Sequence, residues 1–351
     1  MNMGDGLGKP FKTLDEQIDI LVKRNLIVKN KEQAKYLLTK HSYYSVINGY
    51  KDIFLKKKQS KFEEDCYEDD TTLTDIINLH DFDKKIRIEI LSALENIEST
   101  LATNINYIFA ERFGENQEQY LNPKNFKPGS ITAKGKSQRD ILIEELKKIC
   151  TSNNHPMKHY RENHYNIPPW ILVKGATFGN LLYIYKLFRK EEKDYLICRC
   201  LGISKSEIDE DLKEFFIKML EIFWRYRNWA AHGGRMYSHK VREQLPYYSQ
   251  AYDRFEIVKT AYNKGQGRND IFALFIGIAF FFKSDATAYL NFAVGINFYI
   301  EKYSKEYKKY GDRVIKQMGL PLDYSKCLFE NLPDVNHSTF LNNINSQLFK
   351  V

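Results

Sequence analysis

LTDIINLHDFDKKIRIEILSALENIESTLATNINYIFAERF, residues 73–113, contains neither proline nor glycine, the two residues that most readily interrupt a helix. Apolar side chains recur in it mostly at intervals of three and four residues, the spacing that places them on one helix face. They are Leu73, Ile76, Ile77, Ile86, Ile90, Leu94, Ile97, Leu101, Ile105 and Ile108. The pattern predicts one long helix, broken at most once, that extends about 60 Å at roughly 1.5 Å per residue.

Helical signals also precede this stretch. Thr13 followed by Glu16 forms a capping-box pattern, and a second short helix is expected at residues 31–40. Residues 41–51, HSYYSVINGYK, form an aromatic cluster that we expect to pack the N-terminal helices onto the rest of the chain. Residues 54–70 are charged and without periodicity, which predicts a loop.

The second half of the chain is helical in pattern as well. Ser204 with Glu207 is a capping box that predicts the start of the next amphipathic helix. After Pro246 we expect three or four further helices, one of them capped by Asn269 or Asp270. Because there is little strand signal, the predicted fold class is all-α.

Charge and composition limit the classes of function. The chain has 351 residues, a formal net charge of +8 and 14% aromatic residues. A modestly basic chain is compatible with a polyanionic partner, and equally with an ordinary basic protein that has none. Its 24 tyrosines could pack in a core, form hydrogen bonds or stack on bases.

Cysteine usage and apolar runs bear on location. The five cysteines are few, odd in number and lack a CxxC pair, which disfavours a disulfide framework and a zinc ribbon and predicts free thiols. The N-terminal residues lack the apolar segment of a signal peptide. The longest apolar run, residues 271–282, is too short to span a bilayer and predicts a buried core helix. We therefore expect a cytoplasmic protein without membrane contact.

Residues 227–232, RNWAAH, carry the side chains best suited to chemistry on RNA. A histidine can transfer protons near neutral pH, and an arginine can hold a phosphate in its planar fork. Five helical steps of about 100° leave Arg227 and His232 roughly 140° apart, so they converge only if the helix ends near His232. Gly233 and Gly234 supply such an end.

Five segments follow one another in the order seen in one group of bacterial proteins. They are Lys9-Pro10-Phe11 with Thr13 and Gln17; Tyr43-Tyr44 through Asn48-Gly49-Tyr50 with Phe54; Leu79 to Arg87 with Glu95 and Glu98; Pro168 to Leu172 with Thr177-Phe178-Gly179; and Arg227-Asn228 with Ala231-His232 and Arg235. Over about residues 9–240 the chain resembles the AbiD/AbiF-type abortive-infection proteins, whose core is a HEPN domain. It departs from their common His-His or His-x-Arg ending, because two glycines follow His232.

The resemblance implies a HEPN-type helical bundle with additional N- and C-terminal helices. Its expected parts are an N-terminal helical segment at 1–70, a HEPN core at 71–245 and a C-terminal helical extension at 246–351. The implied function is a metal-independent endoribonuclease of an anti-phage abortive-infection or toxin–antitoxin system. HEPN sites usually form between two protomers, which implies a homodimer through the core or pairing with another HEPN protein.

The resemblance also implies partners and roles. RNA is the expected substrate, a cognate non-coding RNA is an expected regulator, and no cofactor or metal is expected. The 2′-hydroxyl of the RNA would be the nucleophile, with His232 as general base or general acid. Arg227 would stabilise the developing charge and Asn228 would orient the histidine or the phosphate. The products would be a 2′,3′-cyclic phosphate and a 5′-hydroxyl.

Alternatives to catalysis remain at this stage. Arg227 and His232 could cap or salt-bridge a helix end, or could grip RNA without cutting it, which would make the protein a non-catalytic RNA-binding HEPN module. A toxin controlled by a protein partner is a third hypothesis. Glu95 and Glu98 share a helix face and either hold Arg227 in place or form a solvated surface. We interpret Asp83 and Arg87, at i and i+4, as a surface pair.

Two basic segments and the residues after the motif are candidate RNA contacts, through phosphate neutralisation and base stacking. They are Arg235 and His239; Lys302, Lys305, Lys308, Lys309 and Tyr310; and Lys56, Lys57 and Lys58. Complementation of the helix dipole explains Arg235 about as well. The 302–310 segment is also typical of an amphipathic helix with a tyrosine-rich buried edge.

Overall fold

The computed structural model describes residues 10–329, and they form the all-α fold that the sequence predicts. In this range extended backbone pairs only as isolated bridges, such as the one between Ile27 and Thr72. Lys9, the first residue of the opening motif, lies outside the described residues, as does the end of the C-terminal extension.

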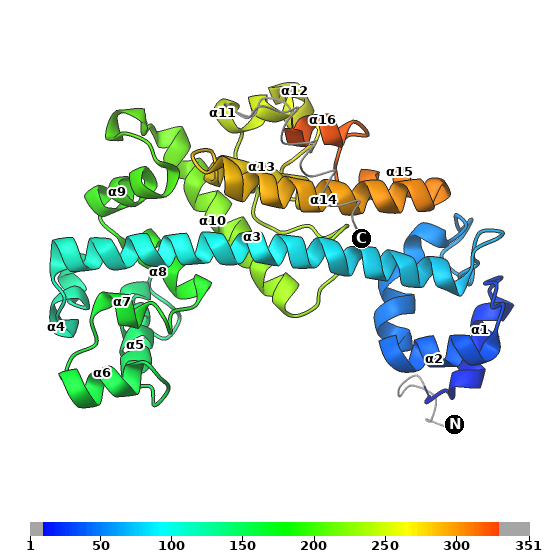
Figure 1. The fold of residues 1–351 in the computed structure, drawn as a ribbon, viewed down its shortest axis with the longest axis horizontal. Coiled ribbons are helices and arrows are strands. Elements are labelled where there is room, and N and C mark those ends of the chain that lie inside the picture. Colours follow the sequence, from blue (N-terminus) through cyan, green and yellow to red (C-terminus); the bar gives the residue numbers. More distant parts are fainter. Residues whose placement is uncertain (1–9, 330–351) are drawn as a thin grey trace.

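Helix α3 (Leu73–Phe113) is the predicted long helix, without a break over its 41 residues. Thr72 caps its start in a box with Asp75, and it ends at Gly114, whose φ of 101° suits a residue without a Cβ. Figure 1 shows it crossing the length of the molecule, so that the other helices are arranged along it.

The N-terminal helices lie at the start of α3 (Figure 1). They are α1 (Leu14–Lys23) and α2 (Lys31–His41), followed by one π-helical turn (Tyr44–Asn48) and one 3-10 turn (Lys51–Phe54). The predicted capping box of Thr13 and Glu16 is present at α1. Tyr50, from the aromatic cluster, is buried against α3, as expected for a segment that joins these helices to the rest.

Short helices gather at the other end of α3 (Figure 1). They are α4 (Gln117–Tyr120), α5 (Gln138–Cys150), α6 (Met157–His164), α7 (Pro169–Leu172), α8 (Phe178–Leu187) and α9 (Lys190–Leu201). Of these, α4, α7, α8 and α9 contact α3 directly. Their packing leaves part of the polar face of α3 uncovered, in a groove between α3 and α7.

Helix α10 (Glu210–Ala231) contacts α3 and carries the Arg–His motif in its last turn. The prediction that Ser204 opens this helix is wrong. The box of Ser204 and Glu207 closes on a single 3-10 turn, and α10 is capped by Asp209, which accepts a hydrogen bond from the amide of Leu212 at 2.6 Å. Two capping signals five residues apart compete, and the apolar periodicity begins only after the second.

The C-terminal region contains more helices than the three or four predicted. Within residues 246–329 they are α11 (Ser249–Tyr252), α12 (Lys259–Asn263), α13 (Ile271–Phe281), α14 (Ala286–Glu306), α15 (Lys308–Gln317) and α16 (Tyr324–Phe329). Three of them have only four to six residues, too few for a periodic pattern to reveal. Of the two predicted caps, Asp270 is the one that caps α13.

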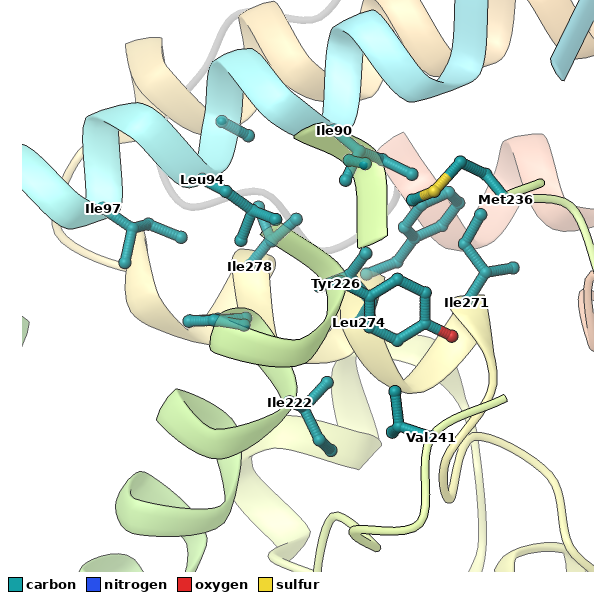
Figure 2. Packing of buried hydrophobic residues seen from close by; sticks show 14 of the residues in the cluster. Ile90, Leu94, Ile97, Ile222, Tyr226, Met236, Val241, Ile271, Leu274 and Ile278 are labelled. Carbon is teal, nitrogen blue, oxygen red and sulfur yellow. The ribbon is translucent and has the colours of Figure 1, made fainter. Parts of the chain in front are cut away.

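The core is continuous along α3, α10 and α13. Figure 2 shows Leu94 and Ile97 of α3 pointing toward α10 and α13, with Ile278 of α13 beneath Leu94 and Tyr226 of α10 in the same cluster. All 11 residues of α13 are buried, which confirms the predicted core helix. No helix among residues 10–329 is long and apolar enough to cross a membrane. The buried residues of the predicted N-terminal, central and C-terminal parts join in one cluster, and the proposed boundaries at 70 and 245 stay a prediction.

Candidate active site at the end of helix α10

Helix α10 ends where the sequence predicts. Ala231 is its last residue and His232 is the C-cap, and Gly233 takes a φ of 74°. The amide of Gly233 donates to the carbonyl of Ala230 at 3.0 Å and that of Gly234 to the carbonyl of Trp229 at 2.9 Å. The two glycines thus turn the chain sharply away and leave the imidazole of His232 exposed at the helix end.

Arg227 is held from α3 by Glu98. Its Nε donates to Oε2 of Glu98 at 3.1 Å, and the two side chains are about one third and one sixth exposed (34% and 17%). The predicted pairing of a long-helix glutamate with Arg227 is therefore present for Glu98. Glu95 is exposed and does not contact Arg227. Because only Nε is engaged, both terminal nitrogens of Arg227 lack a partner among residues 10–329.

The other two motif side chains are open. Neither the imidazole of His232 nor the amide group of Asn228 has a hydrogen-bond partner within the described part of the chain. Arg227 pairs with Glu98, and no hydrogen bond within the described part of the chain joins it to His232. The predicted convergence of the two side chains is therefore not seen, although α10 ends at His232. His232 forms no salt bridge within residues 10–329, whereas Arg227 forms one with Glu98, so the alternative of a salt-bridged helix end remains for Arg227.

The turn after His232 is anchored on a buried carboxylate, Asp83 of α3. Its Oδ1 accepts the amides of Met236 and Tyr237, both at 2.8 Å, and its Oδ2 accepts the hydroxyl of Tyr50 at 2.8 Å. Asp83 is fully buried, so the interpretation of Asp83 and Arg87 as a surface pair is wrong. Buried polar groups need partners, and this carboxylate has three donors from two distant segments.

Arg87, one helical turn further along α3, holds the first part of the same turn. Its Nη1 lies 3.8 Å from Oδ2 of Asp83 and donates to the carbonyls of Gly233 and Gly234 at 3.3 and 3.4 Å. Carbonyls just past a helix end lack intrahelical partners, and a cation is the favourable group there. Asp83 and Arg87 together fix the backbone that follows His232.

Burial raises the pKa of Asp83 to about 6, against the opposing effect of its hydrogen bonds with Tyr237, Tyr50 and Met236 and of the nearby Arg87. At pH 7 the carboxylate form still dominates. In that form it accepts all three hydrogen bonds that hold the turn.

Arg235 and His239 also help to fix the segment that follows His232. Arg235 donates from Nη1 to the carbonyl of Gly49 and lies 3.6 Å from Asp52. The ring of His239 stacks on Trp229, with centroids 4.3 Å apart, and burial lowers its pKa. Both side chains tie the segment after the motif to its surroundings, which opposes the expected role of His239 as a cation that grips phosphate.

Three of the resembling segments therefore meet here: residues 49–50, 83–87 and 233–237. Sequence reasoning missed Asp83, Arg87 and Tyr50 as site residues. A signal was available, because Asp83 lies at the i+4 position from Leu79 and at i−3 from Ile86, in the apolar stripe of α3. An acidic residue at a core position of an amphipathic helix indicates a buried carboxylate with dedicated partners.

The two predicted basic segments meet at one place. Lys56 pairs with the carboxylate of Asp69 at 2.7 Å, and Lys309 donates to the carbonyl of the same residue at 2.8 Å. Lys58 pairs with Asp65 and Lys305 with Glu301. Of the seven lysines predicted to contact RNA, Lys57, Lys302 and Lys308 are exposed and have no partner among residues 10–329.

Tyr310 does not belong to this exposed surface. Its ring is 4% exposed, and its hydroxyl shares a hydrogen bond with Thr71 at 3.0 Å. The tyrosine-rich edge of this segment is thus a packing edge at Tyr310, and stacking of a base on that ring is excluded by burial.

Among residues 10–329 no three His, Cys, Asp or Glu side chains are grouped as metal ligands would be. The five cysteines are free thiols, as predicted.

Fold and site together define an all-α protein with an exposed imidazole and an ion-paired guanidinium at one anchored helix end. The sequence model of the family described as Abi-like protein matches residues 36–238, more than half of the chain, so the protein belongs to the Abi-like family. That membership supports a role in abortive infection. Comparisons with curated proteins and with solved structures each found no match.

Proposed function

We propose that this Abi-like protein is a metal-independent endoribonuclease with a HEPN-type core, of the AbiD/AbiF type, acting in anti-phage abortive infection. The observation that carries the proposal is the end of α10, where Glu98 orients Arg227 while His232 stays exposed. Arg235 and the buried Asp83 form hydrogen bonds that fix the turn after α10. Such support is typical of a site whose geometry matters.

The chemistry needs only groups that these residues supply. His232 would remove the proton from the 2′-hydroxyl or return one to the leaving 5′-oxygen. The two free terminal nitrogens of Arg227 would bind the phosphate and stabilise its charge as the cyclic phosphate forms. Asn228, half-buried in the same turn, would orient the phosphate or the imidazole.

A single protomer offers one imidazole of this motif, whereas general base and general acid are two tasks. A homodimer through the core would bring two copies of His232 to one RNA strand. The exposure of His232 at the end of α10 is compatible with such an arrangement. We also propose that a cognate non-coding RNA regulates the protein through its basic surface.

The experiment that tests the proposal is an RNA cleavage assay in excess EDTA. Wild type is compared with His232→Ala and with a control, His164→Ala, which removes an exposed histidine from α6. General acid–base catalysis contributes about 10²- to 10⁴-fold, so the rate should fall by that factor in the first variant only. Mapped products should end in a 2′,3′-cyclic phosphate. Equal cleavage by both variants would remove His232 from the mechanism.

A second function has one observation in its favour. The basic segments around Lys56 and Lys309 meet at Asp69, and both are far in sequence from the Arg–His motif. Together they form a surface suited to RNA phosphates. A non-catalytic RNA-binding module would use this surface alone. Tight, salt-sensitive RNA binding by wild type and His232→Ala, with no cleavage by either, would favour that function.

A further inference from the structure

An open groove lies beside the site, between α3 and the segment around α7. Its volume is about 390 Å³, within the range of small-molecule sites, roughly 300–1,000 Å³. The polar and aromatic side chains that line it include Glu95, Glu98, Thr103, Asn106, Trp170 and Lys174. Apart from Glu98, the side chains of the groove take no part in the proposed cleavage.

The groove is joined to the candidate active site through Glu98. That carboxylate lines the groove and also accepts the Nε of Arg227 at 3.1 Å. A phosphate bound by the terminal nitrogens of Arg227 would therefore lie at the edge of the groove. The nucleoside next to that phosphate is the part of an RNA strand that would reach into it.

We propose that this groove binds an unpaired guanine of the RNA, next to the phosphate held by Arg227. The inference rests on the proposed ribonuclease function for its biological meaning. The binding itself can be tested without cleavage.

Glu95 supplies the selectivity for guanine. Its carboxylate has no hydrogen-bond or ionic partner among residues 10–329 and offers two acceptor oxygens in the groove. Guanine alone among the four RNA bases carries two neighbouring N–H donors, N1–H and the N2 amino group, on its pairing edge. A carboxylate can accept both at once, whereas adenine and cytosine each present one amino donor beside a ring acceptor.

Trp170 supplies the stacking surface. Its side chain is 41% exposed although it lines the groove, and an aromatic face of this kind stacks on a base. The charges agree with this orientation of the RNA. The carboxylates of Glu95 and Glu98 disfavour a phosphate inside the groove, while the exposed Lys174 at its wall suits a flanking phosphate.

The test is a binding measurement by fluorescence anisotropy. The probes are labelled 2′-O-methyl uridine nonamers with guanine, inosine, adenine or cytosine at the central position. The methyl group removes the nucleophile, so binding is read without cleavage. A bidentate contact discriminates by roughly 1–3 kcal/mol, so the guanine probe should bind about tenfold more tightly than the inosine probe, which lacks the N2 amino group.

Variants locate the effect. Glu95→Gln should abolish the preference for guanine, and the matched Glu214→Gln, at an exposed glutamate of α10, should retain it. Trp170→Ala should weaken binding of the guanine probe about tenfold and Trp170→Phe should restore most of it. Equal affinity of wild type for the four probes overturns the proposal, as does a guanine preference that survives Glu95→Gln. If wild type binds the guanine probe preferentially but does not cleave ordinary RNA, the result counts against the ribonuclease function alone.

Discussion

The end of helix α10 and helix α13 are both packed against the same core, yet they are held by different forces. All residues of α13 are buried and apolar, and the side chain of Asp270 caps its first turn. The turn after α10 is held by a buried carboxylate, two arginines and a tryptophan. Apolar burial is strong but non-directional, whereas hydrogen bonds specify position.

The difference indicates which region stabilises the fold and which one sets the geometry of the site. Substitutions in α13 should act mainly on the free energy of unfolding. Substitutions in the residues that hold the turn after α10, such as Asp83, should lower the rate of cleavage by more than their cost in stability explains. Substitutions at Leu274 and Asp83 separate the two effects, and substitutions at Lys302 and Lys308 probe RNA contact in the C-terminal region.

The largest effect is expected at Leu274 in α13. Leu274→Ala should lower the free energy of unfolding by about 2–5 kcal/mol, because the fully buried side chain leaves a cavity in a packed core. Urea unfolding measures this. Val258→Ala, at a side chain 60% exposed, serves as the control and should change stability by less than about 0.5 kcal/mol. Similar costs for the two variants would contradict apolar burial as the stabilising force there.

Asp83→Asn should have the next largest effect. The amide group replaces one acceptor oxygen, so a buried donor from Tyr50 or Tyr237 loses its partner, at a cost of about 1–3 kcal/mol at pH 7. Cleavage measured where both variants are folded should fall further than in Leu274→Ala. Asp81→Asn, an exposed neighbour on α3, is the control and should leave both properties near wild type.

The pH dependence of Asp83 is a smaller effect with a definite sign. The pKa of Asp83 is raised from 3.8 to about 6, so folding favours the protonated carboxyl. This contribution is fully present below about pH 4 and is lost as the pH rises through 6. Between pH 7 and pH 5.5 the stability of wild type relative to Asp83→Asn should increase, by on the order of 1 kcal/mol. A difference in stability that falls over this interval would contradict the assignment.

The smallest effect is expected at the unpaired lysines of the C-terminal region. The double variant Lys302→Gln/Lys308→Gln should lower the slope of log affinity against log salt by about 1.4 for single-stranded RNA, at roughly 0.7 per phosphate contact. The matched double variant Lys305→Gln/Lys309→Gln removes lysines already paired with Glu301 and Glu68. It should change the slope less. Equal slopes in both would argue against RNA contact at Lys302 and Lys308.

Periodicity and capping patterns predicted much of this protein. The unbroken α3, the end of α10 just before Gly233 and the buried α13 follow from local signals, because propensity and apolar spacing act within one helix. The exception at Ser204 is local as well, since a neighbouring cap at Asp209 competes with it.

The sequence by itself thus determined the fold class, the long helix and the Arg–His motif at a helix end. Only the tertiary structure decided that Asp83 is buried under the turn, that Glu98 rather than Glu95 holds Arg227, and that Tyr310 is closed to RNA. Each of these depends on contacts between segments far apart in the chain. The partner of a polar side chain is set by how the helices pack against one another. A one-dimensional pattern of residues does not contain that information.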